Sequence, residues 1–297
     1  MANMSSYDDS IKSYALHGLT SEDKKYAATY LNETDETRKS AIEEIKRWIE
    51  ESDDLHDRLD DFLILRFLRV SKFDLEKTKI RIRNFLKQRF DLPEWFTNTD
   101  PLQPELQEIL DLGTLLPLRK PDNQGRIIYI VRGTVHDPRI HKISNIFKIS
   151  RMAMDIAMKY YPVGSVYGYM IFSDVSNITL GHITQLRPYV IMNYVRAMQN
   201  CYPGRIQSMT IFNAPVIFDI VTRIFKTFMT QKLKSRFNVY SSQNCFKDIP
   251  ANILPVEYGG TDGTIQELTD YWKKLIEENR EWLLTDDNND KITILRR

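Results

Sequence analysis

Asp174 is the residue of this sequence best placed for chemistry, because it lies near the end of an apolar run, residues 169–175, that is typical of a buried strand. Open α/β sheets hold functional groups at the carboxyl ends of their strands. The neighbouring Ser173, Ser176 and Asn177 are equally the residues with which a loop satisfies buried backbone donors. The pattern therefore favours a structural role for Asp174 over a catalytic one.

The other reactive side chains lack the spacing of known catalytic or metal sites. The five histidines show no zinc-protease spacing and no cluster with cysteine. His136 and His141 bracket a loop with Asp137, where a weak metal pair is an alternative, but exposed loop histidines are the favoured interpretation. No nucleophile elbow, phosphate loop or dinucleotide fingerprint is present, and EYGGTDG predicts a tight turn. Cys201 is expected to be an inert, buried thiol. We expect no enzymatic activity, no metal and no cofactor.

Composition indicates a globular protein with a balanced surface. The 297 residues carry a formal net charge of +1, which gives no reason to expect nucleic acid as a partner. Two cysteines cannot form a disulfide framework, and the first residues lack the pattern of a secretory signal. No apolar run approaches the roughly 18 residues of a membrane span. The expected location is cytoplasmic, with transient peripheral contact to membranes.

Hydrophobic periodicity predicts two types of architecture along the chain. Helices alone are expected over residues 21–31, 37–51, 61–70 and 74–90, followed by a boundary rich in proline. Strands at 127–131, 169–175, 209–212 and 238–242 then alternate with helices at 145–161 and 188–200, and residues 264–284 form a last helix. The predicted fold class is α/β, a helical N-terminal domain followed by a mainly parallel sheet flanked by helices. The predicted divisions are 1–100, 105–265 and 266–297.

The segment 214–236 predicts an amphipathic lid. Placed on one helix, its apolar residues cover about half the circumference, more than the roughly 100° stripe of an ordinary surface helix. A buried core helix is equally compatible with this periodicity. The cations that follow favour an element that touches an anionic membrane surface, although a helix dipole also attracts cations to a helix end. The apolar residues are Val216, Ile217, Phe218, Ile220, Val221, Ile224, Phe225, Phe228 and Met229, and the cations are Lys226, Lys232, Lys234 and Arg236.

The chain resembles the CRAL-TRIO lipid-binding family over residues 60–260. Three segments carry this resemblance: DDFLILRFLRVSKFDLEKTKIRIRNFLKQR, NAPVIFDIVTRIFKTFMTQKLKSR and DIPANILPVEYGG. Within it, the chain looks most similar to the branch that holds alpha-tocopherol transfer protein and cellular retinaldehyde-binding protein. The resemblance implies a lipid pocket closed by a helical gate that opens at membranes, with residues 214–236 as the gate. By this resemblance the pocket is formed by Phe147, Ser150, Met154, Tyr169, Ile171, Ser173, Leu186, Val190, Tyr194, Met198, Met209, Val221, Ile224, Phe225, Phe228 and Met229.

The resemblance also implies a basic groove beside the gate that binds phosphoinositide headgroups. The matching cations are Arg205, Lys232 and Arg236, whereas Ser71 and Gln207 occupy positions where the tocopherol-carrying relative is basic. The leading hypothesis is a carrier that exchanges a small hydrophobic lipid, such as a retinoid, a tocopherol or another isoprenoid, at membranes. The alternative is a phosphoinositide-binding adaptor in membrane traffic, and an enzyme that uses Asp174 is the least favoured reading.

Overall fold

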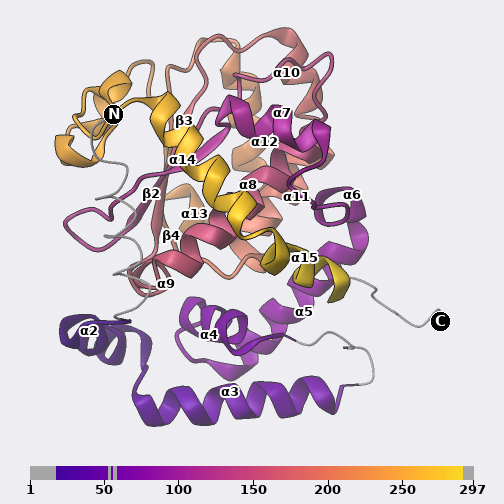
Figure 1. The fold of residues 1–297 in the computed structure, drawn as a ribbon, viewed down its shortest axis with the longest axis vertical. Helices are drawn as coiled ribbons and strands as arrows, with labels where there is room; N and C mark the ends of the chain where they lie inside the picture. The colour runs from indigo at the N-terminus through magenta and orange to yellow at the C-terminus, as the bar shows by residue number, and fades with distance from the viewer. Residues whose placement is uncertain (1–17, 53–54, 56–58, 290–297) are drawn as a thin grey trace.

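The N-terminal helices begin at side chains that cap their first turns. In this computed structural model, which describes residues 18–52, 55 and 59–289, α2 (Ser21–Leu31) and α3 (Asp35–Glu50) each start with a capping box. Asp60 and Asp74 accept backbone hydrogen bonds at the starts of α4 (Asp61–Val70) and α5 (Leu75–Asp91). These oxygens satisfy helix donors that would otherwise be unpaired. Figure 1 shows α2, α3 and α4 at the lower end of the molecule, away from the sheet.

Buried arginines tie these helices to the rest of the chain. Arg69 of α4 donates to both carboxylate oxygens of Glu33 at 2.8 Å and to the hydroxyl of Ser165 at 2.6 Å. One turn earlier, Arg66 donates to Asp155 at 3.1 Å and to the hydroxyl of Tyr202 at 2.8 Å. Because charged groups are rarely buried without partners, these contacts fix how α4 docks.

A five-stranded sheet forms the centre of the larger part, in the order β1-β2-β3-β4-β5. The short edge strand β1 pairs antiparallel with β2, and every other pair is parallel. Tyr169 pairs with Ile127 and Ile171 pairs with Tyr129, so these four side chains share one face. The strands are β1 (Leu115–Pro117), β2 (Ile127–Val131), β3 (Tyr169–Asp174), β4 (Ile206–Phe212) and β5 (Phe237–Val239).

Helices form the crossovers that parallel strands require. They also supply the walls of the candidate site described below. Between β2 and β3 lie α8 (Ile143–Tyr160) and α9 (Val163–Tyr167); between β3 and β4 lie α10 (Leu180–Gln185), α11 (Pro188–Arg196) and the π-helix η1 (Ala197–Cys201); between β4 and β5 lie α12 (Phe218–Phe228) and α13 (Gln231–Lys234).

Two helices lie within the predicted proline-rich boundary. Pro93 and Pro104 occupy the first turns of α6 (Pro93–Phe96) and α7 (Pro104–Leu112), where a missing N–H costs nothing. The C-terminal segment packs back onto this region, since α14 (Ile265–Glu278) contacts α7, α8 and β1, and Trp272 donates to the carbonyl of Pro117 at 2.6 Å. The remaining elements are the short turns η2 (Asn244–Phe246), η3 (Ala251–Ile253) and η4 (Val256–Tyr258) and the final helix α15 (Arg280–Asn289).

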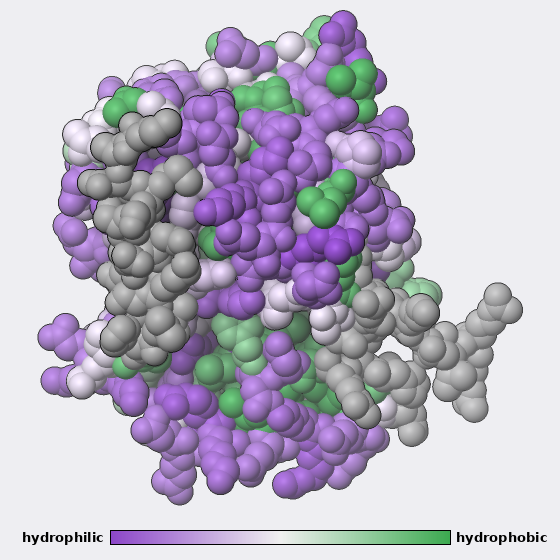
Figure 2. Space-filling model, viewed as in Figure 1, coloured by the Kyte–Doolittle hydropathy of each residue, from purple (hydrophilic) through white to green (hydrophobic). Residues whose placement is uncertain are grey.

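The predicted fold class is confirmed: helices precede a mainly parallel sheet that helices flank. Residues 1–17 and 290–297, which the predicted first and last divisions include, lie outside the described residues. Figure 2 shows a mostly hydrophilic face on which hydrophobic residues gather over α4. Among the helices that the structure describes, none is both long and apolar enough to pass through a bilayer.

Candidate functional site

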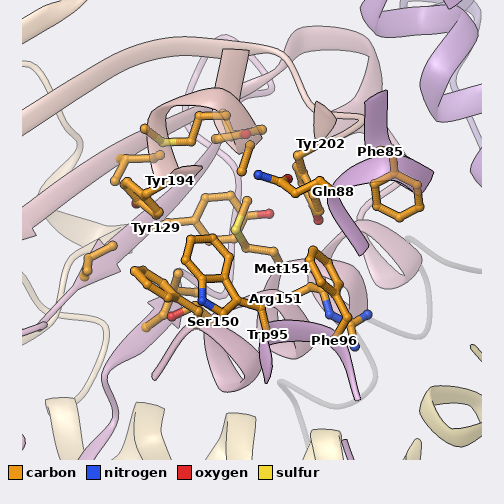
Figure 3. Close-up of a pocket in the computed structure, with 17 residues that line it drawn as sticks. Phe85, Gln88, Trp95, Phe96, Tyr129, Ser150, Arg151, Met154, Tyr194 and Tyr202 are labelled. Carbon is orange, nitrogen blue, oxygen red and sulfur yellow. The ribbon is translucent and has the colours of Figure 1, made fainter. Parts of the chain in front are cut away.

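A largely apolar pocket lies where the N-terminal helices meet the sheet. The space between protein atoms there amounts to about 780 Å³, a figure that includes space open to solvent. Figure 3 shows labelled side chains from both parts of the chain arranged around this space. The lining comprises Phe85, Gln88, Trp95, Phe96, Leu115, Tyr129, Val131, Phe147, Ser150, Arg151, Met154, Tyr169, Ile171, Tyr194, Ala197, Met198 and Tyr202.

Aromatic rings connect the N-terminal part to the predicted lid through this pocket. Trp95 packs on Phe147 at a centroid distance of 4.3 Å, and Phe147 stacks on Tyr194 at 5.4 Å. Tyr194 in turn meets Phe225 of α12 edge to face at 6.1 Å. Rings in such contact form a continuous apolar wall that suits a long hydrophobic molecule.

One end of the pocket is polar. The hydroxyl of Tyr202 accepts from Arg66 and donates to Asp155 at 2.8 Å, which closes a triad of which Arg66 is buried and the other two residues are half-buried. Beside it, the hydroxyls of Tyr129 and Tyr169 are buried and make no hydrogen bond with any residue that the structure describes. The rings of these two tyrosines meet edge to face at 5.2 Å.

Burial keeps these phenols protonated. It raises the pKa of Tyr194 to about 12 and the pKa of Tyr129 and Tyr169 well above the ordinary value for tyrosine. For Tyr169 the neighbouring Arg66 and Arg81 act in the opposite direction without overcoming burial. The hydroxyls are therefore able to donate hydrogen bonds at neutral pH.

The predicted pocket residues fall into two groups. Seven line the pocket: Phe147, Ser150, Met154, Tyr169, Ile171, Tyr194 and Met198. The others lie outside its lining; Val190 packs beside Trp95 and Phe147, and most of the remainder belong to the adjoining apolar core. For these nine a role in cargo binding stays a prediction: Ser173, Leu186, Val190, Met209, Val221, Ile224, Phe225, Phe228 and Met229.

The contribution of the N-terminal helices to the pocket was not foreseen. Phe85 and Gln88 come from α5, and Trp95 and Phe96 from α6. The adjacent Trp95 and Phe96, which begin two residues after Pro93, were a usable signal, because large aromatic side chains are seldom left in a solvated linker.

The predicted lid is two helices, because α12 ends at Phe228 and Met229 is extended. The extended residue interrupts the hydrogen-bond ladder, so the helix does not continue to Arg236, and Val216, Ile217 and Met229 lie outside the helix that holds the other apolar residues. Val221 and Phe225 point into the core, whereas Val216 and Ile220 are 85% and 59% exposed.

Gln199 of the π-helix holds the end of α12. Its side-chain amide donates to the carbonyl of Phe228 at 3.1 Å and accepts from the N–H of Thr230 at 3.1 Å. Because the last carbonyls of a helix lack partners within the helix, this contact caps α12 and joins it to the wall of the pocket.

A basic cleft adjoins the pocket, and Met198 lines both. The predicted Arg205, Lys232 and Arg236 all line this cleft. Lys72 and Arg81 line it as well. The sequence did not predict Arg81 in this cleft, because a cation on a highly charged helix most often lies on an ordinary solvated face. We call these five cations the basic cleft.

The electrostatics of the basic cleft favour an anion. Partial burial lowers the pKa of Lys232, and Arg236, Lys72, Arg81 and Arg205 lower it further by repulsion. No ion pair joins these cations to an acidic residue among those described; Arg81 instead donates to the carbonyls of Gln199 and Tyr202. Gln207 also lines the cleft. Ser71, which precedes Lys72 in the sequence, is buried and does not line the cleft.

The catalytic candidates have structural partners. Asp174 accepts from the N–H of Ser176 at 2.9 Å, from the amide of Asn213 at 3.0 Å and from the hydroxyl of Tyr258 at 3.0 Å. These hydrogen bonds satisfy the carboxylate of Asp174 at the end of β3, so its burial needs no catalytic role as an explanation. Cys201 is buried, which raises the pKa of its thiol to about 11.

The histidines differ from expectation in one respect. His136 is only 4% exposed rather than a solvated loop residue, and it contacts Gln185 at 2.8 Å. His182 packs against it, and its Nε2 lies 3.0 Å from the carbonyl oxygen of His136. Across the described ranges, no three His, Cys, Asp or Glu residues are grouped as a metal site would require.

Two family models match the chain. The CRAL/TRIO domain matches residues 113–260, and the Pinta-like UBA domain matches residues 34–106. The SEC14 cytosolic factor of Kluyveromyces lactis is 31% identical over 222 residues, which cover 69% of this chain and 72% of that protein. The chain therefore belongs to the CRAL/TRIO domain family of lipid-binding and lipid-transfer proteins, which confirms the resemblance noted in the sequence.

Among its relatives is the alpha-tocopherol transfer protein-like protein of Mus musculus. It is 29% identical over 209 residues, which cover 70% of this chain and 60% of that relative's length. Among solved structures, the crystal structure of Sfh5 matches with a TM-score of 0.49 and 14% identity, covering 83% of this chain and 98% of that one.

Proposed function

We propose that this protein carries one small hydrophobic lipid and exchanges it at membranes by displacement of α12. The observation that carries the proposal is the apolar pocket whose aromatic wall ends on Phe225 of α12. Burial of about 400 Å² of cargo surface contributes about 10 kcal/mol at roughly 25 cal/mol per Å², before the costs of association. Tight binding therefore needs no charged anchor.

The outer face of the lid supports the membrane step. Val216, Ile217 and Ile220 are exposed within five residues of the chain, at and just before the start of α12, and Arg223 and Lys226 follow on that helix. Exposed bulky apolar residues beside cations suit an element that lies in a bilayer interface. We include in the proposal the division of the chain at residues 1–100, 105–265 and 266–297, with the pocket at the junction of the first two.

Transfer between vesicles tests the carrier proposal. Donor vesicles carry a fluorescent retinoid or tocopherol analogue, acceptor vesicles carry a quencher, and the protein is added in catalytic amounts. The proposal expects a transfer rate proportional to protein concentration. A rate equal to the spontaneous rate for every cargo tested contradicts it.

The basic cleft supports a second proposal, recognition of phosphoinositide headgroups. Its cations lie without acidic partners among the described residues, and phosphate oxygens are their natural ligands. An anionic surface attracts each nearby cation by about 1 kcal/mol, so the double substitution Lys232→Ala with Arg236→Ala should weaken vesicle binding roughly 30-fold.

Vesicle flotation tests this second proposal. The matched control is Lys39→Ala with Lys247→Ala, which removes the same charge from exposed positions outside the cleft and outside the lid. Loss confined to phosphoinositide vesicles and to the cleft variant supports specific recognition. Equal losses in both variants indicate nonspecific attraction to anionic membranes instead.

A further inference from the structure

We infer that His182 is a pH switch, which holds α10 on the loop 133–141 while its ring is neutral and releases α10 when the ring is protonated. The inference rests on the proposed carrier function, because it concerns how firmly the protein retains its cargo. Figure 1 shows α10 at the upper end of the molecule. The helix has only six residues, so side-chain contacts rather than its own hydrogen bonds determine its position.

The hydrogen bonds of His182 are complete only when its ring is neutral. Its Nε2 lies 3.0 Å from the carbonyl oxygen of His136, which only accepts, so this nitrogen carries the proton. Its Nδ1 accepts from the backbone N–H of Thr179, the N-cap of α10, at 3.1 Å, and lies 2.8 Å from the hydroxyl of the same residue. A second proton would occupy Nδ1 and leave the N–H of Thr179 without its acceptor.

α10 lies directly on the loop. The side-chain amide of Gln185 donates to the carbonyls of Pro138 at 3.0 Å and His141 at 2.8 Å. Gly181 packs so closely on Pro138 that a β-carbon there would lie 2.8 Å from a ring carbon. His182 is only 6% exposed in this contact, so a charge on its ring would be buried. A buried charge is unfavourable unless it is paired, and the ring reaches water when α10 leaves the loop.

The groups that face His182 on balance oppose its protonation. Burial lowers the pKa of His182, and the ring of His136, which meets it edge to face at 4.8 Å, lowers the pKa further by repulsion. Hydrogen bonds to the carbonyls of His136 and Thr134 and the charge of Asp137 act in the opposite direction without overcoming burial. The pKa of His182 therefore lies below the 6.5 of an ordinary histidine.

The nearby carboxylates have partners of their own. Asp137 pairs with Arg139 at 2.6 Å, and Glu108 of α7 lies 3.4 Å from the ring of His141. Neither carboxylate forms a hydrogen bond with His182 in the described part of the chain. A protonated His182 therefore gains no ion pair, and release of α10 is the way to hydrate its charge.

α10 leads directly into the wall of the pocket. Only Leu186 and Arg187 separate it from α11, whose Tyr194 lines the pocket and meets Phe225 of α12. α11 also packs on α12. Because the helices are consecutive, release of α10 frees the first turn of α11, and cargo should leave the protein faster.

The lowered pKa determines the direction of the pH effect. A released His182 has the ordinary value of 6.5 and takes up a proton before the docked one does. The docked state is therefore fully stable above pH 6.5 and loses stability as the pH falls from 6.5 through the lowered pKa. Within this window the released population rises by up to about tenfold for each unit of pH.

Amide hydrogen exchange on the full chain at pH 7.0 and pH 5.5 tests the switch. Protection factors, which remove the intrinsic pH dependence of exchange, should fall about 3- to 10-fold in α10 at the lower pH and stay constant in α14. His182→Gln removes the titrating ring but keeps a capping box, so its α10 should be equally protected at both pH values. His141→Asn also removes one imidazole but leaves α10 unaltered, and it should retain the pH dependence.

Cargo release separates failure of the switch from failure of the carrier. A fluorescent tocopherol analogue is loaded at pH 7.0, and its transfer to phosphatidylcholine vesicles should be several-fold faster at pH 5.5, except in His182→Gln. Protection of α10 that does not change with pH, or that still changes in His182→Gln, overturns the switch and leaves the carrier proposal standing. Release that is independent of pH overturns control of the cargo by α10. A protein that loads no lipid at pH 7.0 contradicts the carrier proposal itself.

Discussion

Replacing Val216 and Ile220 with serine should slow lipid transfer without unfolding the protein. Full burial of a valine or isoleucine side chain contributes about 1.5–3 kcal/mol. Scaled by the exposed fractions of 85% and 59%, insertion of both side chains contributes about 2–4 kcal/mol to membrane binding. At about 1.4 kcal/mol per tenfold change, the double variant should bind vesicles at least about 30-fold more weakly.

The assay measures transfer rate and the free energy of unfolding side by side. Since both side chains are largely exposed, unfolding in urea should change by less than about 1 kcal/mol. The matched control is Ile140→Ser with Leu180→Ser, which removes side chains that are 70% and 68% exposed and lie outside residues 214–236. Equal slowing by the control, or destabilisation large enough to explain the slowing, refutes the membrane-contact role of this face.

Three further predictions concern the supports of the site. Gln199→Ala removes two hydrogen bonds, so it should lower the free energy of unfolding by about 1–2 kcal/mol and speed amide hydrogen exchange at the end of α12. Unchanged hydrogen exchange contradicts the capping role of Gln199. Burial raises the pKa of Glu33, but hydrogen bonds and charge from Arg69 and Arg38 outweigh it and the net pKa is lowered from 4.5. The contribution of Glu33 to the free energy of unfolding is therefore complete above pH 4.5 and is lost as the pH falls through its lowered pKa. Glu33→Gln should make the free energy of unfolding depend less steeply on pH in this acidic range. An unchanged pH dependence contradicts the pairing of Glu33 with the two arginines. Cys201, whose burial raises the pKa to about 11, should resist alkylation at pH 8 in the folded protein, and labelling as fast as in urea contradicts its burial.

Local periodicity predicted most of the fold. β2 was predicted to the residue, and α2 and α4 likewise, because each is a short run whose apolar spacing has one interpretation. The edge strand β1 was missed because Leu115–Pro117 is too short for a pattern. The π-helix was missed as well, since η1 continues the periodicity of α11 and differs only in its hydrogen bonds.

The site was less predictable, because it depends on how distant segments meet. Met154 and Tyr194 were assigned to the pocket by resemblance, and the structure has both in its lining. Gln88 and Arg81 face a pocket and a cleft only because Arg66 and Arg69 dock the N-terminal helices against α8 and α9. Such docking depends on contacts of buried arginines with distant residues, which sequence periodicity does not encode.

Native mass spectrometry after incubation with lipid vesicles tests the central claim most directly. The account predicts one lipid bound per chain, and it predicts that Ser150→Trp, which fills the pocket lining, abolishes the adduct, whereas Ser40→Trp on the exposed surface of α3 retains it. A chain that acquires no lipid contradicts the account. So does an adduct that survives in Ser150→Trp at the level of the control.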